Sequence, residues 1–315
     1  MTREAQSIVE PACRPTLRHA VEFALAWTFV HLLRALPRRM ARAAGVAIAA
    51  IAYFALCRLR RVGRRNLELA FPALPAAERS AILRREYRHL GWLLAEFCKM
   101  STYTLASASR FIRYDGLDHY LAARDRGKGV LVLTGHLGAW ELSSFYHSLA
   151  GHPMGMVIRR LDNPLVDRMV NRIRCQHGNR VLHKDDFARG LIGAMRAGET
   201  VGILMDTNMT PPQGLFVPFF GIEACTASGL ARVALKTGAA VLPGFLLWEP
   251  AERQYVLRFG PALSLADTGD AEADAAVNTA LFTAVIEAGV RQYPDQWLWM
   301  HRRWKTRPPG QPAIY

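Results

Sequence analysis

The chain contains few cysteines and arranges none of them in pairs. Five cysteines are scattered through 315 residues, and no CxxC spacing occurs. This distribution excludes a disulfide-rich secreted scaffold and the usual zinc-binding spacings. We therefore expect reduced thiols, as in a cytoplasmic or cytoplasm-facing protein, and no metal site. Glu4, Glu10 and Pro11 precede the first apolar stretch and argue against a secretory signal.

Sequence motifs of several common enzyme classes are also missing. There is no GxSxG segment of serine esterases, no GxxxxGK phosphate loop and no HExxH zinc motif. The glycines of Gly135-His136-Leu137-Gly138 do not fit the dinucleotide-binding pattern. Motifs for binding nucleic acid are likewise not found. We therefore expect no cofactor and no nucleic-acid partner.

Acidic residues are too few to balance the basic ones. The chain has 40 Lys and Arg residues against 26 Asp and Glu residues, which gives a net charge of +14. Such a balance predicts an anionic partner, either nucleic acid, an anionic membrane or an acidic carrier protein. Because no nucleic-acid motif is present, the membrane surface and the acidic carrier remain.

The N-terminal part lacks an uninterrupted apolar run of the ~20 residues that a membrane-spanning helix needs. Residues 17–36 are apolar but interrupted by charged residues and histidines, and the uncharged run 43–57 has only 15 residues. Arginines border that run at positions 38, 39, 42, 58, 60, 61, 64 and 65. Apolar helices with a cationic border are typical of a membrane interface. We expect residues 1–75 to form a helical membrane-docking segment; the alternative is a hairpin buried against the main domain.

The rest of the chain shows the pattern of an α/β domain. Residues 76–105 carry apolar side chains at helical spacing, and after residue 110 short β-rich runs alternate with helical ones. The strand candidates are 111–114, 129–134, 154–159, 200–205, 240–248 and 254–259. The helix candidates are 117–125, 138–150, 164–176, 186–197, 227–237 and 271–292. This alternation predicts a central, mostly parallel sheet flanked by helices, in a domain over residues 76–315.

One strand candidate leads directly to a histidine. Residues 130–134 are apolar or β-branched and bounded by glycines, as in a buried strand, and His136 follows in a turn. In open α/β sheets, ligands bind at the carboxyl ends of the strands. Glu141 stands five residues later, and we interpret His136 as a general base oriented by Glu141. Gly135 and Gly138 permit the turn and leave room for a ligand to approach the backbone.

The spacing of His136 and Glu141 is weak evidence by itself. The 10 histidines and 26 acidic residues predict roughly one such pair by chance. Five residues of helix separate two side chains by about 140°, so these two can meet only if His136 lies in the turn and Glu141 in the first helical turn. The alternative is a partly buried histidine that is hydrogen-bonded near the start of a helix.

Two further polar residues follow predicted strands. Arg159 ends the strand 154–159, where an arginine can hold a phosphate or a carboxylate through two hydrogen bonds. The alternative is an ordinary surface arginine. Asp206 follows the strand 200–205, where it can face the same crevice as His136 or bond its own backbone in a turn.

Two aromatic segments have both a lipid-facing and a core interpretation. Residues 216–221, FVPFFG, can line an acyl-chain groove or belong to the core, and Thr226 is expected to cap the helix that follows. Trp297, Trp299 and Trp304 alternate with arginines and a lysine. This alternation suits either contact with lipid headgroups or a C-terminal segment packed by stacking on arginine.

Several of these segments together resemble a known family. They are RRNLELAFP (64–72), HLGAWE (136–141), RRLDNPLVD (159–167), the stretch from Asp206 through GLFVPFFG to Thr226, and YPDQWLWMHRRWKTRP (293–308). The segments occur in the order of the family and together span most of the chain, from residue 64 to residue 308. With them, the chain is similar to the bacterial lipid A biosynthesis acyltransferases of the lauroyl and myristoyl type. These belong to the wider lysophospholipid acyltransferase superfamily, whose signature is a histidine, four residues, and then Asp or Glu.

The resemblance implies an activity and a place in the cell. It implies transfer of a fatty acyl chain from an acyl thioester, on acyl-carrier protein or coenzyme A, to a hydroxyl of an anionic lipid acceptor. The site would face the cytoplasm at the inner membrane. Ala139 and Arg160 stand where many relatives carry Asn and Pro, which leaves the identity of the acceptor open.

The resemblance also implies site residues. His136 and Glu141 match the catalytic pair, and Arg159 matches an arginine that the family places close to that pair. Asp206 falls where relatives carry an acidic residue before the FVPFFG segment. The predicted substrate contacts are Arg159, Asp206, Gly138 and Asn163.

In the mechanism that follows from this assignment, His136 takes the proton of the acceptor hydroxyl as its oxygen attacks the thioester carbonyl. Glu141 fixes the tautomer of the ring. Arg159 or backbone N–H groups of residues 135–138 are the candidate donors to the oxyanion. The alternatives are a thioesterase or other hydrolase, a non-catalytic lipid-binding protein of the same fold, and acyl transfer to a lysophospholipid or an ornithine-type lipid.

Overall fold

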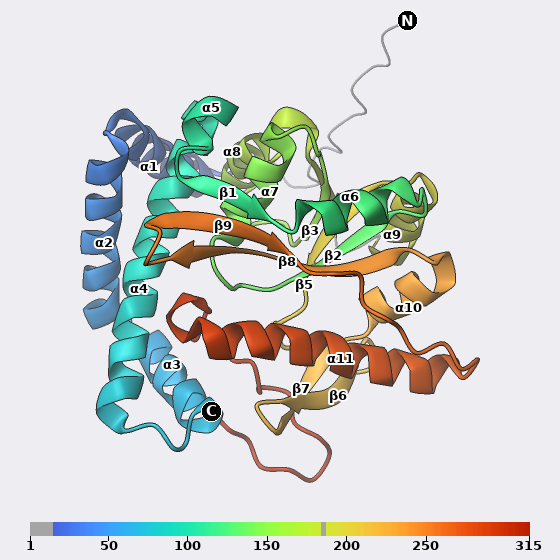
Figure 1. The fold of residues 1–315 in the computed structure, drawn as a ribbon. Coiled ribbons are helices and arrows are strands. Elements are labelled where there is room, and N and C mark those ends of the chain that lie inside the picture. Colours follow the sequence, from blue (N-terminus) through green and yellow to red (C-terminus); the bar gives the residue numbers. More distant parts are fainter. Residues whose placement is uncertain (1–14, 184–186) are drawn as a thin grey trace, which may run out of the picture.

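The computed structural model describes residues 15–183 and 187–315, so the features at positions 4, 10 and 11 lie outside the described part. Four helices make up its N-terminal section: α1 (Leu17–Ala35), α2 (Arg38–Ala55), α3 (Cys57–Ala70) and α4 (Ala76–Lys99). α2 runs along α4 through Gly45 and Gly91, where an added Cβ would lie 2.1 Å and 2.5 Å from a backbone oxygen of the opposite helix. These glycines let the two helices meet at backbone distance. α3 then bends by 88° from α2 (Figure 1).

A seven-stranded sheet forms the centre of the domain. Its strands are β1 (Ile112–Asp115), β2 (Val130–Thr134), β3 (Gly155–Ile158), β4 (Arg180–His183), β5 (Thr200–Leu204), β8 (Ala240–Glu249) and β9 (Gln254–Phe259). Their order is β1-β9-β8-β2-β5-β3-β4, and all neighbours are parallel except the β8–β9 hairpin. β6 (Gly214–Phe219) and β7 (Ile222–Ala227) form a separate antiparallel hairpin. The predicted α/β fold with a mostly parallel central sheet is confirmed.

Helices cover both faces of the sheet and create two cores. They are α5 (Leu105–Ala108), α6 (Leu117–Asp125), α7 (Trp140–Leu149), α8 (Pro164–Arg174), α9 (Phe187–Arg196), α10 (Gly229–Thr237) and α11 (Ala271–Gln292). Along β2, Leu131 and Leu133 join the core that includes side chains of α9, α10 and α11. Val130 and Val132 join the core with α6 and α7. Because successive strand residues point to opposite faces, a wholly apolar strand buries both of them.

The sequence pattern predicts six of the strands but not β4, β6 and β7. The FVPFFG segment lies in the β6–β7 hairpin, and Phe219 and Phe220 are buried in the core. The expected helix cap at Thr226 is wrong, because Thr226 ends a buried stretch of β7 and α10 begins at Gly229. The Thr226 hydroxyl instead accepts a hydrogen bond from the buried guanidinium of Arg303.

Candidate membrane spans are few among the residues that the structure describes. By length and composition, α11 qualifies, and α2 and α3 qualify only when the bent pair is counted as one span. In α11, 44% of the qualifying window is buried, and the helix packs against β6 and α10. α11 therefore has the character of a core helix. The membrane-docking role of the N-terminal helices remains a prediction at this point.

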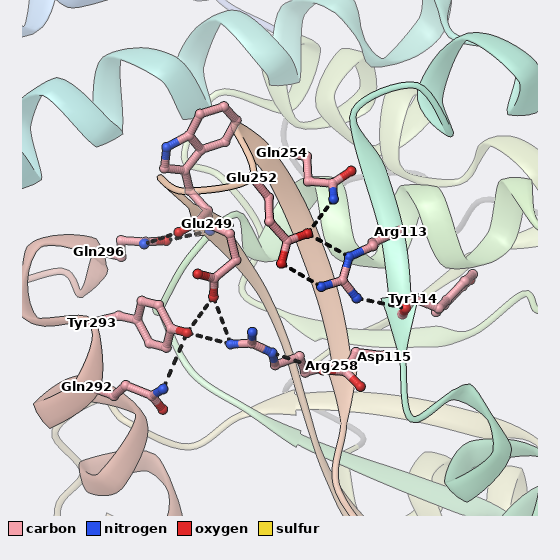
Figure 2. A network of polar contacts seen from close by, with 11 residues as sticks. Arg113, Tyr114, Asp115, Glu249, Glu252, Gln254, Arg258, Gln292, Tyr293 and Gln296 are labelled. Carbon is pink, nitrogen blue, oxygen red and sulfur yellow. Dashed lines mark hydrogen bonds and ion pairs between the residues drawn. The ribbon is translucent and has the colours of Figure 1, made fainter.

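A polar network joins the β8–β9 hairpin to its neighbours (Figure 2). Arg258 on β9 binds Glu249 on β8 at 2.9 Å and Asp115 on β1 at 3.2 Å. The side-chain amide of Gln296 accepts from the N–H of Trp248 and donates to the carbonyl of Trp248, both at 2.9 Å. These two bonds fix residues 293–308, which we call the C-terminal segment, to the end of β8. β8 is the strand beside β2.

Candidate active site

His136 lies in the turn after β2, and Asp206 lies two residues after the end of β5. Nδ1 of His136 is 2.9 Å from Oδ1 of Asp206, and the backbone N–H of His136 donates to Oδ2 at 2.6 Å. Since β2 and β5 are parallel neighbours, their carboxyl ends bring together two residues that are 70 positions apart. The Asp206 side chain is only 2% exposed, whereas that of His136 is 26% exposed. The pair therefore consists of a buried acid and an accessible ring.

Three donors hold the Asp206 carboxylate as an anion. In addition to the two bonds from His136, Nε1–H of Trp297 donates to Oδ2 at 2.8 Å. Burial disfavours the charged carboxylate, but the charge of His136 and these hydrogen bonds outweigh burial, so the pKa of Asp206 is lowered. Burial likewise disfavours the protonated ring, yet the adjacent carboxylate raises the pKa of His136 above its ordinary value.

The hydrogen bond to Asp206 also sets the tautomer of His136. A carboxylate can only accept, so in the neutral ring Nδ1 carries the proton and Nε2 keeps its lone pair. Nε2 makes no hydrogen bond within the described part of the chain and is the ring atom that can take a proton from a bound molecule. The Trp140 ring lies edge-on to the imidazole, with 5.1 Å between the centroids. This arrangement has the geometry that a general base requires.

Glu141 does not hold the ring of His136, and the orienting role predicted for it is filled by Asp206. Glu141 lies in the first turn of α7, and its carboxylate makes a bidentate ion pair with Arg174, the last residue of α8. Nε of Arg174 donates to Oε2 of Glu141 at 2.9 Å. The start of α7 directs Glu141 toward α8 rather than back to the turn. Glu141 still acts on His136 through its charge, which contributes to the raised pKa of the ring; a catalytic role for Glu141 stays a prediction.

Arg159 is a surface residue in this structure. Its side chain is 78% exposed and donates to Asp162 at 2.8 Å. The cation beside the candidate site is instead Arg174, which is 15% exposed. The sequence offers only one signal for Arg174, a basic residue in the last turn of the predicted helix 164–176. Such residues are common at helix C-termini, so this signal does not single it out.

The space around Gly138 is filled by other parts of the protein and is not open to a ligand. Its φ is +68°, and an added Cβ would lie 2.1 Å from the carbonyl oxygen of Leu246. Its N–H donates to the carbonyl of Gln296 at 2.9 Å. The expectation that Gly138 leaves room for a ligand is therefore wrong, because β8 and the C-terminal segment fill that room.

Asn163 connects α8 to α1 through hydrogen bonds of its side chain. Its Oδ1 accepts from the N–H of Leu165 and of Val166, which caps the start of α8. Its Nδ2 donates to the carbonyl of His19 at 2.9 Å and to Glu22 at 3.0 Å, both on α1. With donor and acceptor both engaged, Asn163 has a structural role here, and the predicted substrate contact has no support in the geometry.

A cavity of about 60 Å³ lies beside the Glu141–Arg174 ion pair. It is bounded by β2, β3, β5, β8, α7 and α8, and its lining residues are Val132, Thr134, Trp140, Glu141, Ser143, Ser144, Met154, Met156, Ile158, Arg174, Gly202, Leu204 and Gly244. Most of the lining is apolar, and the polar groups come mainly from α7 and α8. Trp140 both lines the cavity and contacts His136. Trp140 therefore links the lining of the cavity to the imidazole.

Backbone amides of the 136–139 turn are largely committed to the protein itself. The N–H of His136 donates to Asp206, that of Gly138 to Gln296, and that of Ala139 to the carbonyl of Leu246. These three amides are not available to an oxyanion in this arrangement.

The C-terminal segment forms several hydrogen bonds with the loop that carries Asp206. Trp297 donates to Asp206, and Nη1 of Arg303 donates to the carbonyl of Thr207 at 3.3 Å. The N–H of Asn208 donates to Nε2 of His301 at 2.8 Å. Three consecutive residues of the loop are thus each bound by a different side chain of one segment.

The tryptophans of this segment belong to the core. Trp297, Trp299 and Trp304 are at most 1% exposed. The segment is packed inside the domain, but within residues 15–183 and 187–315 no arginine stacks on these rings, which contact Phe219 and one another instead. Contact of these rings with lipid headgroups is excluded in this fold. The nearby arginine Arg303 is also buried, and burial lowers its pKa to about 10.

A parallel α/β sheet that carries a buried acid and an accessible histidine at the carboxyl ends of adjacent strands defines an enzyme site suited to proton transfer. The particular family follows from comparison with known sequences. The family described as bacterial lipid A biosynthesis acyltransferase matches residues 11–306. The chain belongs to this family and is an acyltransferase.

Individual relatives agree with this assignment. The chain is similar to the lipid A biosynthesis palmitoleoyltransferase of Escherichia coli (strain K12), with 29% identity over 86% of this chain and 87% of the relative. It is 29% identical to the lipid A biosynthesis lauroyltransferase of the same organism, over 82% and 83% of the two chains. A lipid A biosynthesis acyltransferase of Haemophilus influenzae is 30% identical over 81% and 80%.

Proposed function

We propose that this chain transfers a fatty acyl group from an acyl thioester to a hydroxyl of a lipid A precursor, with His136 as the general base. The observation that carries the proposal is the His136–Asp206 pair, in which the buried carboxylate binds Nδ1 and leaves Nε2 as the basic atom of the neutral ring at the carboxyl end of β2. The names of the relatives, which are acyltransferases of lipid A biosynthesis, support the class of acceptor.

The proposed reaction needs no nucleophile from the enzyme. Nε2 of His136 takes the proton of the acceptor hydroxyl as its oxygen attacks the thioester carbonyl, and a tetrahedral oxyanion forms. Asp206 stabilises the imidazolium during this step. The intermediate then collapses, the carbon–sulfur bond breaks, and the leaving thiolate takes the proton from Nε2–H. The products are the acylated lipid and a free thiol, and His136 returns to its starting state.

The proposal includes attachment to the cytoplasmic face of the inner membrane through α1 and α2. Large apolar side chains on these helices are exposed to a degree unusual for a folded domain, including Leu17 at 83%, Leu25 at 68%, Ile51 at 68% and Phe54 at 71%. Exposed apolar helices beside arginines suit the interface of an anionic bilayer. The donor is proposed to be an acyl thioester of acyl-carrier protein or coenzyme A, and both are anionic partners for a chain of net charge +14.

The test is lipid analysis of cells that produce the protein. Wild type and His136→Ala are produced in a bacterium that lacks its own enzymes of this family, and lipid A is compared by mass spectrometry. We expect a species heavier by one acyl chain with wild type only, since loss of general-base help costs about 10²–10⁴-fold in rate.

His119→Ala is the matched control. His119 is exposed on α6, away from the carboxyl ends of β2 and β5 that carry His136 and Asp206, and this variant should act like wild type. Full activity of His136→Ala would overturn the mechanism. Acylation of a different lipid by wild type would overturn the proposed acceptor and leave the chemistry in place.

A further inference from the structure

Helix α3 has one face turned to the protein and one turned outward. Val62, Asn66 and Leu67 are buried, and successive residues of a helix are rotated by about 100°, which places Arg58, Arg61, Arg64 and Arg65 on the opposite face. All four of these arginines are exposed. We call this set the α3 arginine face.

The α3 arginine face is not neutralised by its own surroundings. Arg65 pairs with Glu68 at 3.5 Å, while Arg58, Arg61 and Arg64 form no ion pair within residues 15–183 and 187–315. Four positive charges against one negative charge leave +3 on this face, and Arg60 of the same helix adds a further positive charge beside Tyr53. Like charges three or four positions apart on a helix repel each other. An anionic partner would relieve that repulsion.

The inner face of α3 connects it to the candidate active site. Nδ2 of Asn66 donates to the carbonyls of Trp299 and His301, both at 2.7 Å. In the same segment, the N–H of Leu298 donates to the carbonyl of His136 at 3.0 Å. Figure 1 shows α3 beside the C-terminal end of the chain, next to the lower part of α4. A partner on the α3 arginine face would therefore be separated from His136 by α3 itself and by residues 298–301, which contact both.

The chemistry of α3 favours a protein partner over a lipid bilayer. An interfacial helix binds a bilayer by inserting an apolar face, but most of the apolar face of α3 is buried against the protein, and only Leu59, at 37%, counts among its exposed large apolar residues. The strongly exposed apolar side chains belong to α1 and α2, and α3 is bent by 88° from α2. What α3 presents is mainly positive charge, which complements an acidic protein surface.

We infer that the α3 arginine face docks an acidic carrier protein that bears the acyl thioester. This inference rests on the proposed acyl transfer and deepens it, because it names the partner and the surface. Docking there brings a carrier-bound thioester to the side of the domain where the C-terminal segment meets His136. Charge across the contact speeds association and makes it sensitive to salt.

The test reverses the charge of three arginines and compares two donors. The variant is Arg58→Glu/Arg61→Glu/Arg64→Glu, and the donors are a purified acyl-carrier protein thioester and an acyl-pantetheine thioester that lacks the protein. With the carrier-bound donor we expect kcat/KM to fall about tenfold or more and its dependence on salt to weaken. With acyl-pantetheine, kcat/KM should stay as in wild type.

A matched control carries the same change of charge elsewhere. Arg126, Lys128 and Arg196 are exposed and precede β2 or β5, at the opposite end of the strands from His136. The variant Arg126→Glu/Lys128→Glu/Arg196→Glu should keep the rate with both donors. An equal loss in this control would show a general effect of net charge and overturn the inference.

Thermal unfolding checks that the α3 variant is folded, and Arg58→Gln/Arg61→Gln/Arg64→Gln serves as a milder form with the same expected direction. Unchanged turnover of the carrier-bound donor, together with weaker binding to vesicles of phosphatidylethanolamine and phosphatidylglycerol, would assign the face to lipid and overturn the inference. Absence of turnover by wild type with either donor would count against the proposed function itself. In that case, the affinity of the carrier for wild type and the α3 variant, measured by calorimetry, still decides the docking site.

Discussion

Asp206 binds His136 twice, once through the ring and once through the backbone. Oδ1 lies 2.9 Å from Nδ1 of the imidazole, and Oδ2 accepts the backbone N–H of the same histidine at 2.6 Å. One carboxylate therefore fixes both the rotamer of the ring and the position of the turn that carries it. A group that acts on both is better able to keep a general base in place than a partner on the ring alone.

Asp206→Asn should lower activity and move its pH dependence. His136 must be unprotonated to act as a base, so activity rises as pH increases through the pKa of His136, which the carboxylate raises. Without that charge, burial dominates and lowers this pKa, so the acid limb of kcat/KM should shift to lower pH. The plateau should fall by about 10²–10⁴-fold, because the imidazolium loses its counter-charge. An acid limb that stays in place would show that Asp206 does not set the protonation of His136.

Trp297→Phe should make the buried Asp206 carboxylate less stable, because Trp297 is its third hydrogen-bond donor. The change removes the Nε1–H that donates to Oδ2 of Asp206 at 2.8 Å. A lost hydrogen bond to a charged group costs about 1.5–3 kcal/mol, which chemical denaturation can measure, and we expect kcat to fall together with stability. Trp304→Phe is the matched control, since Trp304 is equally buried and its Nε1 has no partner within the described residues. Equal losses in the two variants would mean that packing, and not the hydrogen bond, is responsible.

Glu141 and Arg174 should behave as one coupled unit. The pair is partly buried, with exposed fractions of 24% and 15%, so removing one member leaves the other charge poorly compensated. We expect Glu141→Gln and Arg174→Met each to lower the free energy of unfolding, and the double variant to lose less than the sum by roughly 1–3 kcal/mol.

The pH profile of Glu141→Gln separates this role from that of Asp206. Glu141 contributes to the raised pKa of His136 only by charge at a distance, so the acid limb should move less than in Asp206→Asn. A larger shift in Glu141→Gln would return the orienting role to Glu141.

Gly138→Ala should destabilise the protein by roughly 2–4 kcal/mol. The new Cβ would meet the carbonyl oxygen of Leu246 at 2.1 Å, and the backbone has a φ of +68° that disfavours a side chain. Gly127→Ala is the control, because Gly127 has a φ of +69° with no atom within 4 Å of the added Cβ. That variant should show only the cost of the backbone conformation, about 1–2 kcal/mol. Comparable melting temperatures for the two variants would contradict the close packing of β8 against the turn.

Local sequence was enough to predict the sheet and the position of His136. Val130–Thr134 is apolar on both faces and bounded by glycines, and this pattern has few solutions other than a central buried strand. The helix 271–292 could be predicted at its observed bounds because its apolar spacing is long and regular. β6 and β7 were not predicted, because FVPFFG is apolar throughout and was interpreted only as the lining of an acyl-chain groove or as core.

Pairing between side chains was less predictable. Glu141 is five residues from His136, and Asp206 is 70 residues away, yet Asp206 is the partner. Arg159 follows a strand, but the residue that reaches the site is Arg174 at the end of α8. Distance along the chain does not determine which groups meet, because that depends on strand order and on the direction in which each helix leaves the sheet.

The sequence by itself determined the class of fold, the family and the histidine, because periodicity and glycine-bounded runs are local properties of a chain. The tertiary structure alone decided which acid serves that histidine, since only the parallel pairing of β2 with β5 brings residue 206 beside residue 136. It also decided that the C-terminal tryptophans face inward, where one of them completes the hydrogen bonds of the carboxylate. A buried charge needs several donors at once, and donors from distant segments converge only when the whole domain is folded.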